Sequence, residues 1–169
     1  IVEFDTPREA FHALEEGRAA VGVFPKPEVG ETQPWWTLLS DDSPVRIVSK
    51  LPFGGRPVGR GEQTEGFVLA PIELEESGDD RTLFIVSLPN EISMDTARKK
   101  IANGIDGSAI LGFSANETGD RRFVLVDVPG FFCNRAEAFQ RALSEQGLAP
   151  EGLSVVGAYG VPIPEDALS

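Results

Sequence analysis

The order of apolar runs in the second half of the chain constrains the fold more than any other feature. Runs rich in β-branched and aromatic residues predict four strands, at 82–88, 109–114, 122–128 and 153–159. Helical spacing predicts one helix over 94–105 and another that Asn134 caps and that ends near Glu145, before Gly147. A hairpin turn is expected over 116–120. Two helices therefore alternate with four strands in the order βαββαβ.

This order is the split βαβ pattern of ferredoxin-like domains and predicts an α/β (α+β) protein. The first half predicts a smaller unit. Thr6 and Glu9 have the spacing of a capping box. Strands are expected over 2–4, 21–24, 45–51 and 67–74, and a short helix over 35–39. The acidic stretch 75–80 has the composition of a linker. We therefore expect a truncated lobe over 1–74 and a second domain over 81–169.

The charge and the few reactive residues exclude several classes of protein. The 169 residues carry 15 Lys and Arg against 27 Asp and Glu, a net charge of −12. Such a surface repels nucleic acid and anionic membranes. One cysteine, Cys133, excludes an internal disulfide, and one histidine, His12, argues against a histidine-built metal site. We expect no metal, no cofactor and no membrane span. Because the chain opens on Ile1, we expect a fragment of a longer protein. We expect that protein to be cytoplasmic.

The residues alone indicate no catalytic constellation. The glycine-rich loop 54–61 lacks the spacing of a phosphate-binding loop, although its two arginines could hold a carboxylate. His12 lies in the middle of the first predicted helix without a paired nucleophile. Cys133 is typical of a buried, inert thiol. Trp35 and Trp36 would point about 100° apart on a helix, so both could fill the core or one could face a partner.

Stretches of the first half resemble the prephenate dehydratases. The family pattern F-E-A-L-E-x-G-x-A-x-x-G-V-x-P matches residues 11–25, which read FHALEEGRAAVGVFP. Leu38 and Leu39 stand where the family has a Leu-Leu helix, and residues 47–53 stand where it has a strand ending in Leu-Pro-Ile. The resemblance implies a partial lobe of the periplasmic-binding-protein-like type.

The second half resembles the ACT regulatory domain that follows the dehydratase domain in that family. Residues 83–90 (LFIVSLPN), 124–130 (VLVDVPG) and 156–160 (VGAYG) match its first, third and last strands. The resemblance implies a homodimer formed through this domain and an aromatic amino acid as ligand. A looser likeness, in the Trp-Trp and Leu-Pro-Phe motifs, is to fusion proteins that carry a chorismate mutase ahead of such a region.

The catalytic signature of the family, Thr-Arg-Phe, is altered in this chain. When Phe67 is placed on its phenylalanine, Glu65 and Gly66 replace the threonine and the arginine, and Thr64 precedes them. A guanidinium that would pair with a substrate carboxylate is thus lost. Residues 53–63 are also too few for the second lobe of the family, which forms the other wall of the cleft.

The ligand-binding motifs of the ACT domain are altered as well. The first motif, a Gly-Ala-Leu that opens a helix, falls near Asn90, Ser93, Met94 and Asp95. The second motif, Glu-Ser-Arg-Pro, falls on residues that include Phe113, Ser114 and Asn116. Backbone N–H groups near Ser93 could hold a carboxylate, and Asp95 or Asn116 could meet an ammonium group. Phenylalanine binding is therefore implied by position.

Three functions remain open at this point. The first is a non-catalytic regulatory and dimerisation module of a prephenate dehydratase- or chorismate mutase-like protein of phenylalanine biosynthesis. The second is an active enzyme of the same pathway, either a dehydratase that uses the loop arginines and Glu65 as the acid, or a chorismate mutase carried ahead of Ile1. The third is an interaction domain whose ligand site has been lost. Turnover distinguishes the second, and ligand binding separates the first from the third.

Overall fold

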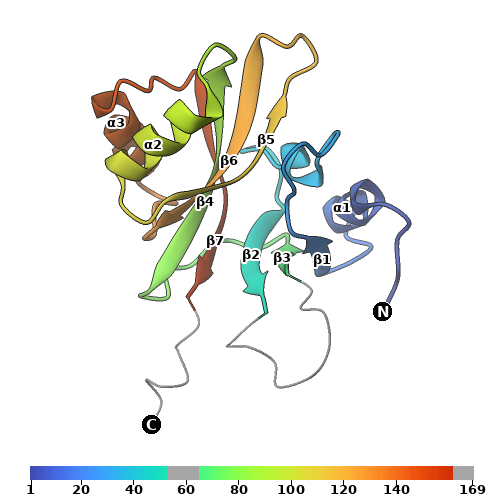
Figure 1. Ribbon diagram of the computed structural model, residues 1–169. Helices are drawn as coiled ribbons and strands as arrows, with labels where there is room; N and C mark the ends of the chain where they lie inside the picture. The colour runs from blue at the N-terminus through green and yellow to red at the C-terminus, as the bar shows by residue number, and fades with distance from the viewer. Residues whose placement is uncertain (53–64, 162–169) are drawn as a thin grey trace, which may run out of the picture.

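A single mixed sheet of seven strands runs through the computed structural model, which describes residues 1–52 and 65–161. The loop over 54–61 and Thr64 lie outside the described residues. The strands are β1 (Gly22–Pro25), β2 (Arg46–Leu51), β3 (Gly66–Ala70), β4 (Asp80–Pro89), β5 (Ala109–Ala115), β6 (Arg121–Pro129) and β7 (Gly152–Gly160). Their spatial order is β1-β3-β2-β7-β4-β6-β5 (Figure 1). The α/β (α+β) class predicted from the sequence is confirmed at this level.

Three α-helices and one 3₁₀ helix complete the fold of the described residues. They are α1 (Pro7–Glu15), η1 (Trp35–Leu38), α2 (Met94–Gly104) and α3 (Ala136–Glu145). The predicted capping box starts α1, because the Glu9 N–H donates to Thr6 Oγ1 (3.3 Å) and the Thr6 N–H donates to Glu9 Oε2 (3.2 Å). Gly147 follows α3 with φ 68°, as its predicted role as a stop requires.

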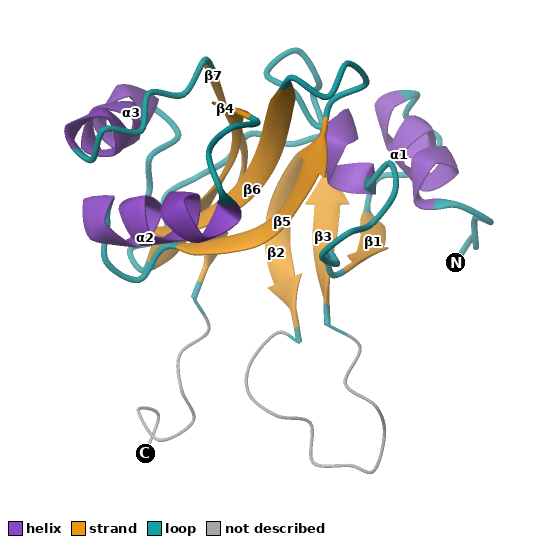
Figure 2. Cartoon of the chain, turned by 45° about the horizontal axis from the view of Figure 1, so that its top comes forward, coloured by secondary structure: helices purple, strands orange, loops and turns teal. Residues whose placement is uncertain are grey.

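The second half reproduces the predicted order of elements, β4-α2-β5-β6-α3-β7. The strands β4 and β6 are buried on both faces, because neighbouring residues alternate between two apolar clusters. Phe84 and Val126 belong to the cluster beneath α2 and α3, whereas Leu83 and Leu125 belong to the cluster beneath α1 and η1. Figure 2 shows α2 and α3 together on one side of the sheet, with α1 at its far end.

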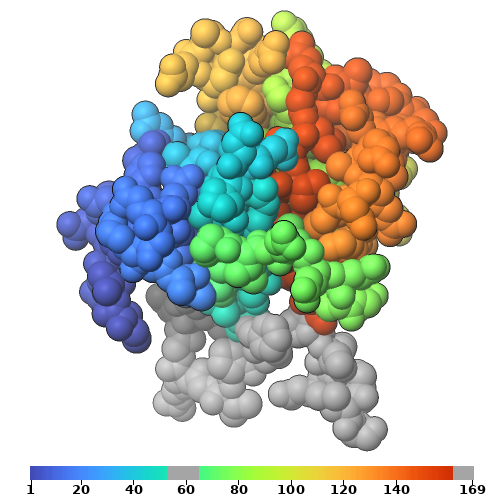
Figure 3. Space-filling model, turned by 180° about the vertical axis from the view of Figure 1, so that it is seen from behind, coloured from blue at the N-terminus to red at the C-terminus, as the bar shows by residue number. Residues whose placement is uncertain are grey.

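The two halves of the chain meet where β2 runs parallel to β7. Ile47 is opposite Gly157, and a Cβ added to Gly157 would lie 2.5 Å from the Ile47 Cβ and 2.6 Å from the Ile47 carbonyl oxygen. Gly112 of β5 makes a second close contact, since its Cβ would lie 3.3 Å from both Pro27 and Trp36. Seen from behind, the first half (blue to cyan) lies directly against the C-terminal strand (Figure 3). The division into two domains stays a prediction.

Some expected details of the fold are wrong. Residues 2–4 form no strand, since no neighbouring strand pairs with them, and β3 ends at Ala70, before Pro71. The helix expected to be capped by Asn134 begins at Ala136, and its N-cap, Arg135, makes no side-chain capping bond. Both adjacent tryptophans, Trp35 and Trp36, are buried, at 3% and 0% exposure, so neither is available to a partner.

Candidate functional site

Gly66 and Phe67 of the altered signature lie on β3, and Glu65 directly precedes this strand. Phe67, whose side chain is 1% exposed, packs its ring 6.5 Å from the Trp35 ring and 6.4 Å from the Tyr159 ring. The position of the family's arginine is Gly66, which pairs with Pro25 of β1. A Cβ at Gly66 would lie 2.5 Å from the Phe24 carbonyl oxygen. No side chain, cationic or otherwise, fits there unless β1 moves.

Glu65, the candidate acid, is held as a carboxylate. It forms an exposed ion pair with Lys26, and the hydrogen bond and charge of that ammonium lower the pKa of Glu65 below its ordinary value. A general acid needs a raised pKa so that it carries a proton near neutral pH. Glu65 therefore has the character of a structural residue, whose ion pair with Lys26 joins the end of β1 to the start of β3.

The predicted residues at the start of α2 serve the helix itself. The Ser93 hydroxyl accepts a hydrogen bond from the Thr96 N–H (3.2 Å) and donates to Thr96 Oγ1 (2.8 Å), so Ser93 is the N-cap. Asp95 forms an exposed ion pair with Arg98 (3.2 Å). Met94 packs against the cluster beneath α2 and α3. The first-turn amides that could hold a carboxylate are present here, as in any helix with this geometry.

Arg122 of β6, which the sequence reasoning did not select, links the two predicted ligand motifs. Its Nη2 donates to Asn90 Oδ1 (2.8 Å), its Nη1 donates to the Ile92 carbonyl (3.2 Å), and its guanidinium lies 5.6 Å from the centre of the Phe113 ring. Asn90 and Phe113 are thus brought together, as the resemblance implies. The only signal that could have pointed to Arg122 is the pairing of the β5–β6 hairpin, in which Arg122 is opposite Ala115.

Ser114 and Asn116 lie elsewhere, on a groove between the β5–β6 hairpin and the first half of the chain. The groove has a volume of about 720 Å³. Its lining comes from α1 (Arg8), the loop 31–33, η1 (Thr37), residues 114–118 of the hairpin and Phe123 of β6. Asn116 also shapes the hairpin turn, because its Nδ2 donates to Thr118 Oγ1 (2.9 Å) and to Asp120 Oδ1 (2.8 Å). The predicted ligand residues therefore fall at two separate places.

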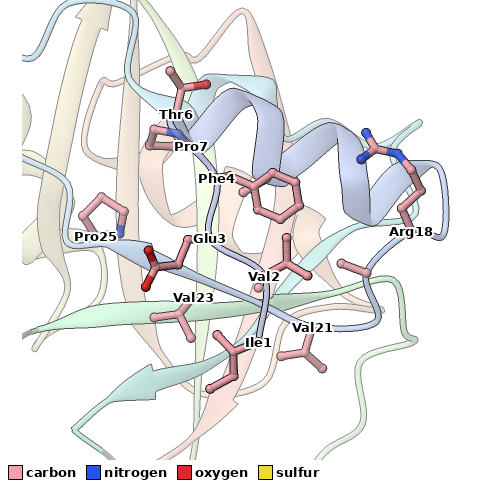
Figure 4. A pocket seen from close by; sticks show the side chains of 13 residues that line it. Ile1, Val2, Glu3, Phe4, Thr6, Pro7, Arg18, Val21, Val23 and Pro25 are labelled. Atoms are coloured by element: carbon pink, nitrogen blue, oxygen red, sulfur yellow. The ribbon is translucent and has the colours of Figure 1, made fainter.

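A second hollow, of about 780 Å³, lies beside the edge strand β1. Figure 4 shows Val2, Phe4, Val21 and Val23 around it, with Arg18 at its rim. The two β1-side valines are exposed, at 59% for Val21 and 63% for Val23. This hollow is mainly apolar, and the charged side chains in its lining are Glu3 and Arg18.

The remaining reactive side chains are occupied or inert. Glu15 stands between His12 and Ser43: its carboxylate is 3.3 Å from His12 Nδ1 and accepts from the Ser43 hydroxyl (3.3 Å). In a Ser-His-Asp triad an imidazole accepts the proton of the serine hydroxyl, and here the Glu15 carboxylate occupies that place. Burial raises the pKa of Cys133 to about 11, so its thiol stays protonated and unreactive at neutral pH.

A buried polar network ties together three strands of the second half. The Arg81 Nε donates to Asp127 Oδ1 (2.7 Å), and the Tyr159 hydroxyl donates to Asp127 Oδ2 (2.7 Å). Burial and the neighbouring Asp127 charge raise the pKa of Tyr159 above its ordinary value. The Asp127 side chain, 5% exposed, is thus fully paired. The network has the character of a structural tie, because its members are directed at each other.

Residues 1–52 and 65–161 lack two further classes of feature. Within these ranges, no group of three or more His, Cys, Asp or Glu side chains is arranged to hold a metal ion. In the same part of the chain, no helix combines the length and the apolar character needed to cross a bilayer.

Comparison with known proteins gives a likeness in fold. No protein-family model and no curated protein matches the sequence. The solved structure of "GqqA – a novel type of quorum quenching acylases" aligns with a TM-score of 0.63 and 17% identity, over 95% of this chain and 82% of that one. Prephenate dehydratase from Streptococcus mutans aligns with a TM-score of 0.54 and 17% identity, over 96% and 86%. Prephenate dehydratase from Arthrobacter aurescens, in complex with L-Phe, aligns with a TM-score of 0.58 and 12% identity, over 95% and 81%. At such identities the likeness shows the fold alone.

Proposed function

We propose that this chain is a non-catalytic regulatory and dimerisation module of a prephenate dehydratase- or chorismate mutase-like protein. Its second half acts as an ACT-like domain that binds an aromatic amino acid. The module belongs to the biosynthesis of phenylalanine in the cytoplasm. The likeness in fold to two prephenate dehydratases, one of them solved with L-Phe, supports this direction.

The observation that carries the non-catalytic part is the close contact at Gly66. The dehydratase signature has its cation at this position, and here a Cβ would meet the backbone of β1 at 2.5 Å. The neighbouring phenylalanine is in the core, and the neighbouring acid is paired with Lys26. Among the described residues, a carboxylate substrate therefore finds no guanidinium at the position of the family's arginine and no protonated acid at Glu65. Arg56 and Arg60 lie outside these residues.

The regulatory part is supported by the open edge of the sheet and by the Arg122 cluster. Among the described strands, β5 pairs with β6 alone, so its outer edge is free to pair with a second copy. Arg122 holds the loop before α2 against the hairpin next to that edge. A ligand that contacts either segment would therefore also affect the edge at which two copies meet.

The test combines turnover with ligand binding on the same preparation. We expect no conversion of prephenate, and a higher melting temperature with one of phenylalanine, tyrosine or tryptophan at millimolar concentration. A ligand at 100 times its dissociation constant adds about 2.7 kcal/mol, which corresponds to a shift of roughly 5–10 °C for a chain of this size. Turnover of prephenate would overturn the non-catalytic assignment. The absence of any shift would leave an assembly domain without an amino acid effector.

An acylase function, which the name of one structural neighbour suggests, is not supported by the residues of the site. An acyl-transfer enzyme needs an activated nucleophile next to a base. Among the described residues, the Ser43 hydroxyl donates to Glu15 rather than to His12, and the Cys133 thiol has a raised pKa.

A further inference from the structure

We propose that the groove between the first half and the β5–β6 hairpin binds the amino acid effector as a zwitterion, with Arg8 holding its carboxylate and Glu31 and Glu117 facing its ammonium group. This inference rests on the proposed function, because it gives the place and the chemistry of the same effector. It differs from a site at the start of α2, where the resemblance alone would put the ligand.

The groove is built from both halves of the chain. One wall consists of Arg8 of α1, the loop 31–33 and Thr37 of η1, and the other wall consists of the hairpin residues 114–118. Its volume of about 720 Å³ falls within the range of small-molecule sites. Two of the residues selected from the sequence, Ser114 and Asn116, line it. At the start of α2, where the sequence predicts that backbone N–H groups could hold a carboxylate, the Ser93 hydroxyl already accepts from the Thr96 N–H.

The charges on the walls suit a zwitterion. Within the described part of the chain, neither Arg8 nor Glu117 takes part in an ion pair, and Glu31 accepts only a long hydrogen bond from the Glu28 N–H (3.4 Å). A lone guanidinium recognises a carboxylate, and carboxylates recognise an ammonium group. One cation and two acids around a single groove thus match a ligand that carries both charges.

Two further features of the groove, Phe123 and Gln33, suit a ligand with an apolar side chain. Phe123 lines the groove and packs against the cluster beneath α1 and η1, which offers an apolar surface next to the charged groups. Gln33, also in the lining, has φ 51°, the left-handed conformation that non-glycine residues rarely adopt. Such strain persists where the surroundings enforce it and is frequent at ligand-binding positions.

A ligand in this groove would contact residues that are far apart in the sequence. Arg8 and Glu31 belong to the first half, and Glu117 belongs to the hairpin that carries the free edge strand β5. Binding would therefore stabilise the packing of the two halves against each other, in addition to changing the edge at which copies meet.

The experiment measures the dissociation constant of L-phenylalanine by calorimetry for the wild-type chain and four variants, of which Arg122→Gln tests the start of α2. Arg8→Gln and Glu117→Gln each remove one charge from the groove, and Arg141→Gln removes a matched, exposed charge from α3. We expect at least a tenfold weaker binding for the two groove variants and an unchanged constant for the control. Phenylalaninamide, which lacks the carboxylate, should bind wild type and Arg8→Gln equally. N-acetylphenylalanine, which lacks the ammonium group, should bind wild type and Glu117→Gln equally.

The outcomes separate this inference from the proposed function. If L-phenylalanine binds the wild type and both groove variants as tightly as it binds the control, the inference is overturned while the regulatory function stands. If Arg122→Gln alone abolishes binding, the site lies at the start of α2. If neither L-phenylalanine nor another aromatic amino acid binds the wild type, the effector part of the proposed function is overturned, and the inference falls with it. Unchanged far-ultraviolet circular dichroism of each variant shows that it is folded.

Discussion

At Gly66 a single missing Cβ decides what the chain can do. Pairing in the sheet puts the Cα of Gly66 opposite Pro25, and the Phe24 carbonyl occupies the space that a side chain would need. The packing of β1 against β3 therefore requires a residue without a Cβ at this position. A catalytic cation could not be restored here by a single substitution, because β1 and β3 would first have to separate.

We expect Gly66→Ala to destabilise the protein by about 1–3 kcal/mol, the usual cost of forcing extra volume into a packed site. The reason is the 2.5 Å approach of the new Cβ to the Phe24 oxygen. Urea unfolding measures the change. Gly152→Ala is the matched control, since its Cβ would lie 3.6 Å from the Ser87 Cβ, an ordinary contact. Equal stabilities of the two variants would contradict the packing described for β1 and β3.

At the scale of elements, local signals were predictable from the sequence and long-range contacts were not. The capping box of Thr6 and Glu9 and the turn over 116–120 involve residues a few positions apart, so their spacing reveals them. Arg122 meets Asn90 and Phe113 only through the folding of β4, β5 and β6 together. The burial of both Trp35 and Trp36 likewise depends on β3, on β5 and on the last residue of β1, Pro25.

The candidate site shows the same limit. The resemblance placed Phe113, Ser114 and Asn116 in one motif, but neighbouring strand residues point to opposite faces of a sheet. Phe113 consequently packs beneath α2 and α3, and Ser114 lines the groove on the other side. The bulge between Ile110 and Gly112 shifts the register and could not be read from the sequence. The opposite wall, with Arg8, could not be predicted because nothing in the sequence links α1 to the hairpin.

The buried polar network of Arg81, Asp127 and Tyr159, which joins β4, β6 and β7, leads to a prediction about stability. We expect Arg81→Met to cost about 3–5 kcal/mol, because it leaves the buried Asp127 carboxylate without its cation. Arg121→Met is the control: its ion pair with Glu151 has a similar length, 2.8 Å, but both partners are about half exposed. The control should cost less than about 1 kcal/mol. Thermal and urea unfolding of both variants measure the difference, and similar losses would show that burial does not matter at Asp127.

For the whole molecule, the sheet that joins the two halves predicts cooperative unfolding. The parallel pairing of β2 with β7 leaves no room for a Cβ at Gly157, and the cluster beneath α1 and η1 includes Val156 and Tyr159 of β7. The only two tryptophans lie in η1, so tryptophan fluorescence reports on the first half. Circular dichroism of the backbone reports on all helices and strands.

We expect the two signals to coincide in wild-type urea unfolding and to separate in Gly157→Ala, with fluorescence changing at the lower urea concentration. The new Cβ would lie 2.5 Å from the Ile47 Cβ and push β2 away from β7. Gly152→Ala, on the same strand, should keep the two transitions together. Coincident and unshifted transitions in Gly157→Ala would show that the halves are not coupled through this junction.

The pairing of β2 with β7 also sets an order of events during synthesis of the protein. Ile47 leaves the ribosome about 110 residues before its partner Gly157. Until then β2 lacks its neighbour β7 on one edge, and the apolar cluster beneath α1 and η1 lacks Val156 and Tyr159. Nascent chains that stop short of β7 should therefore expose the edge of β2 and depend on chaperones, whereas release of the last strand completes both halves at once.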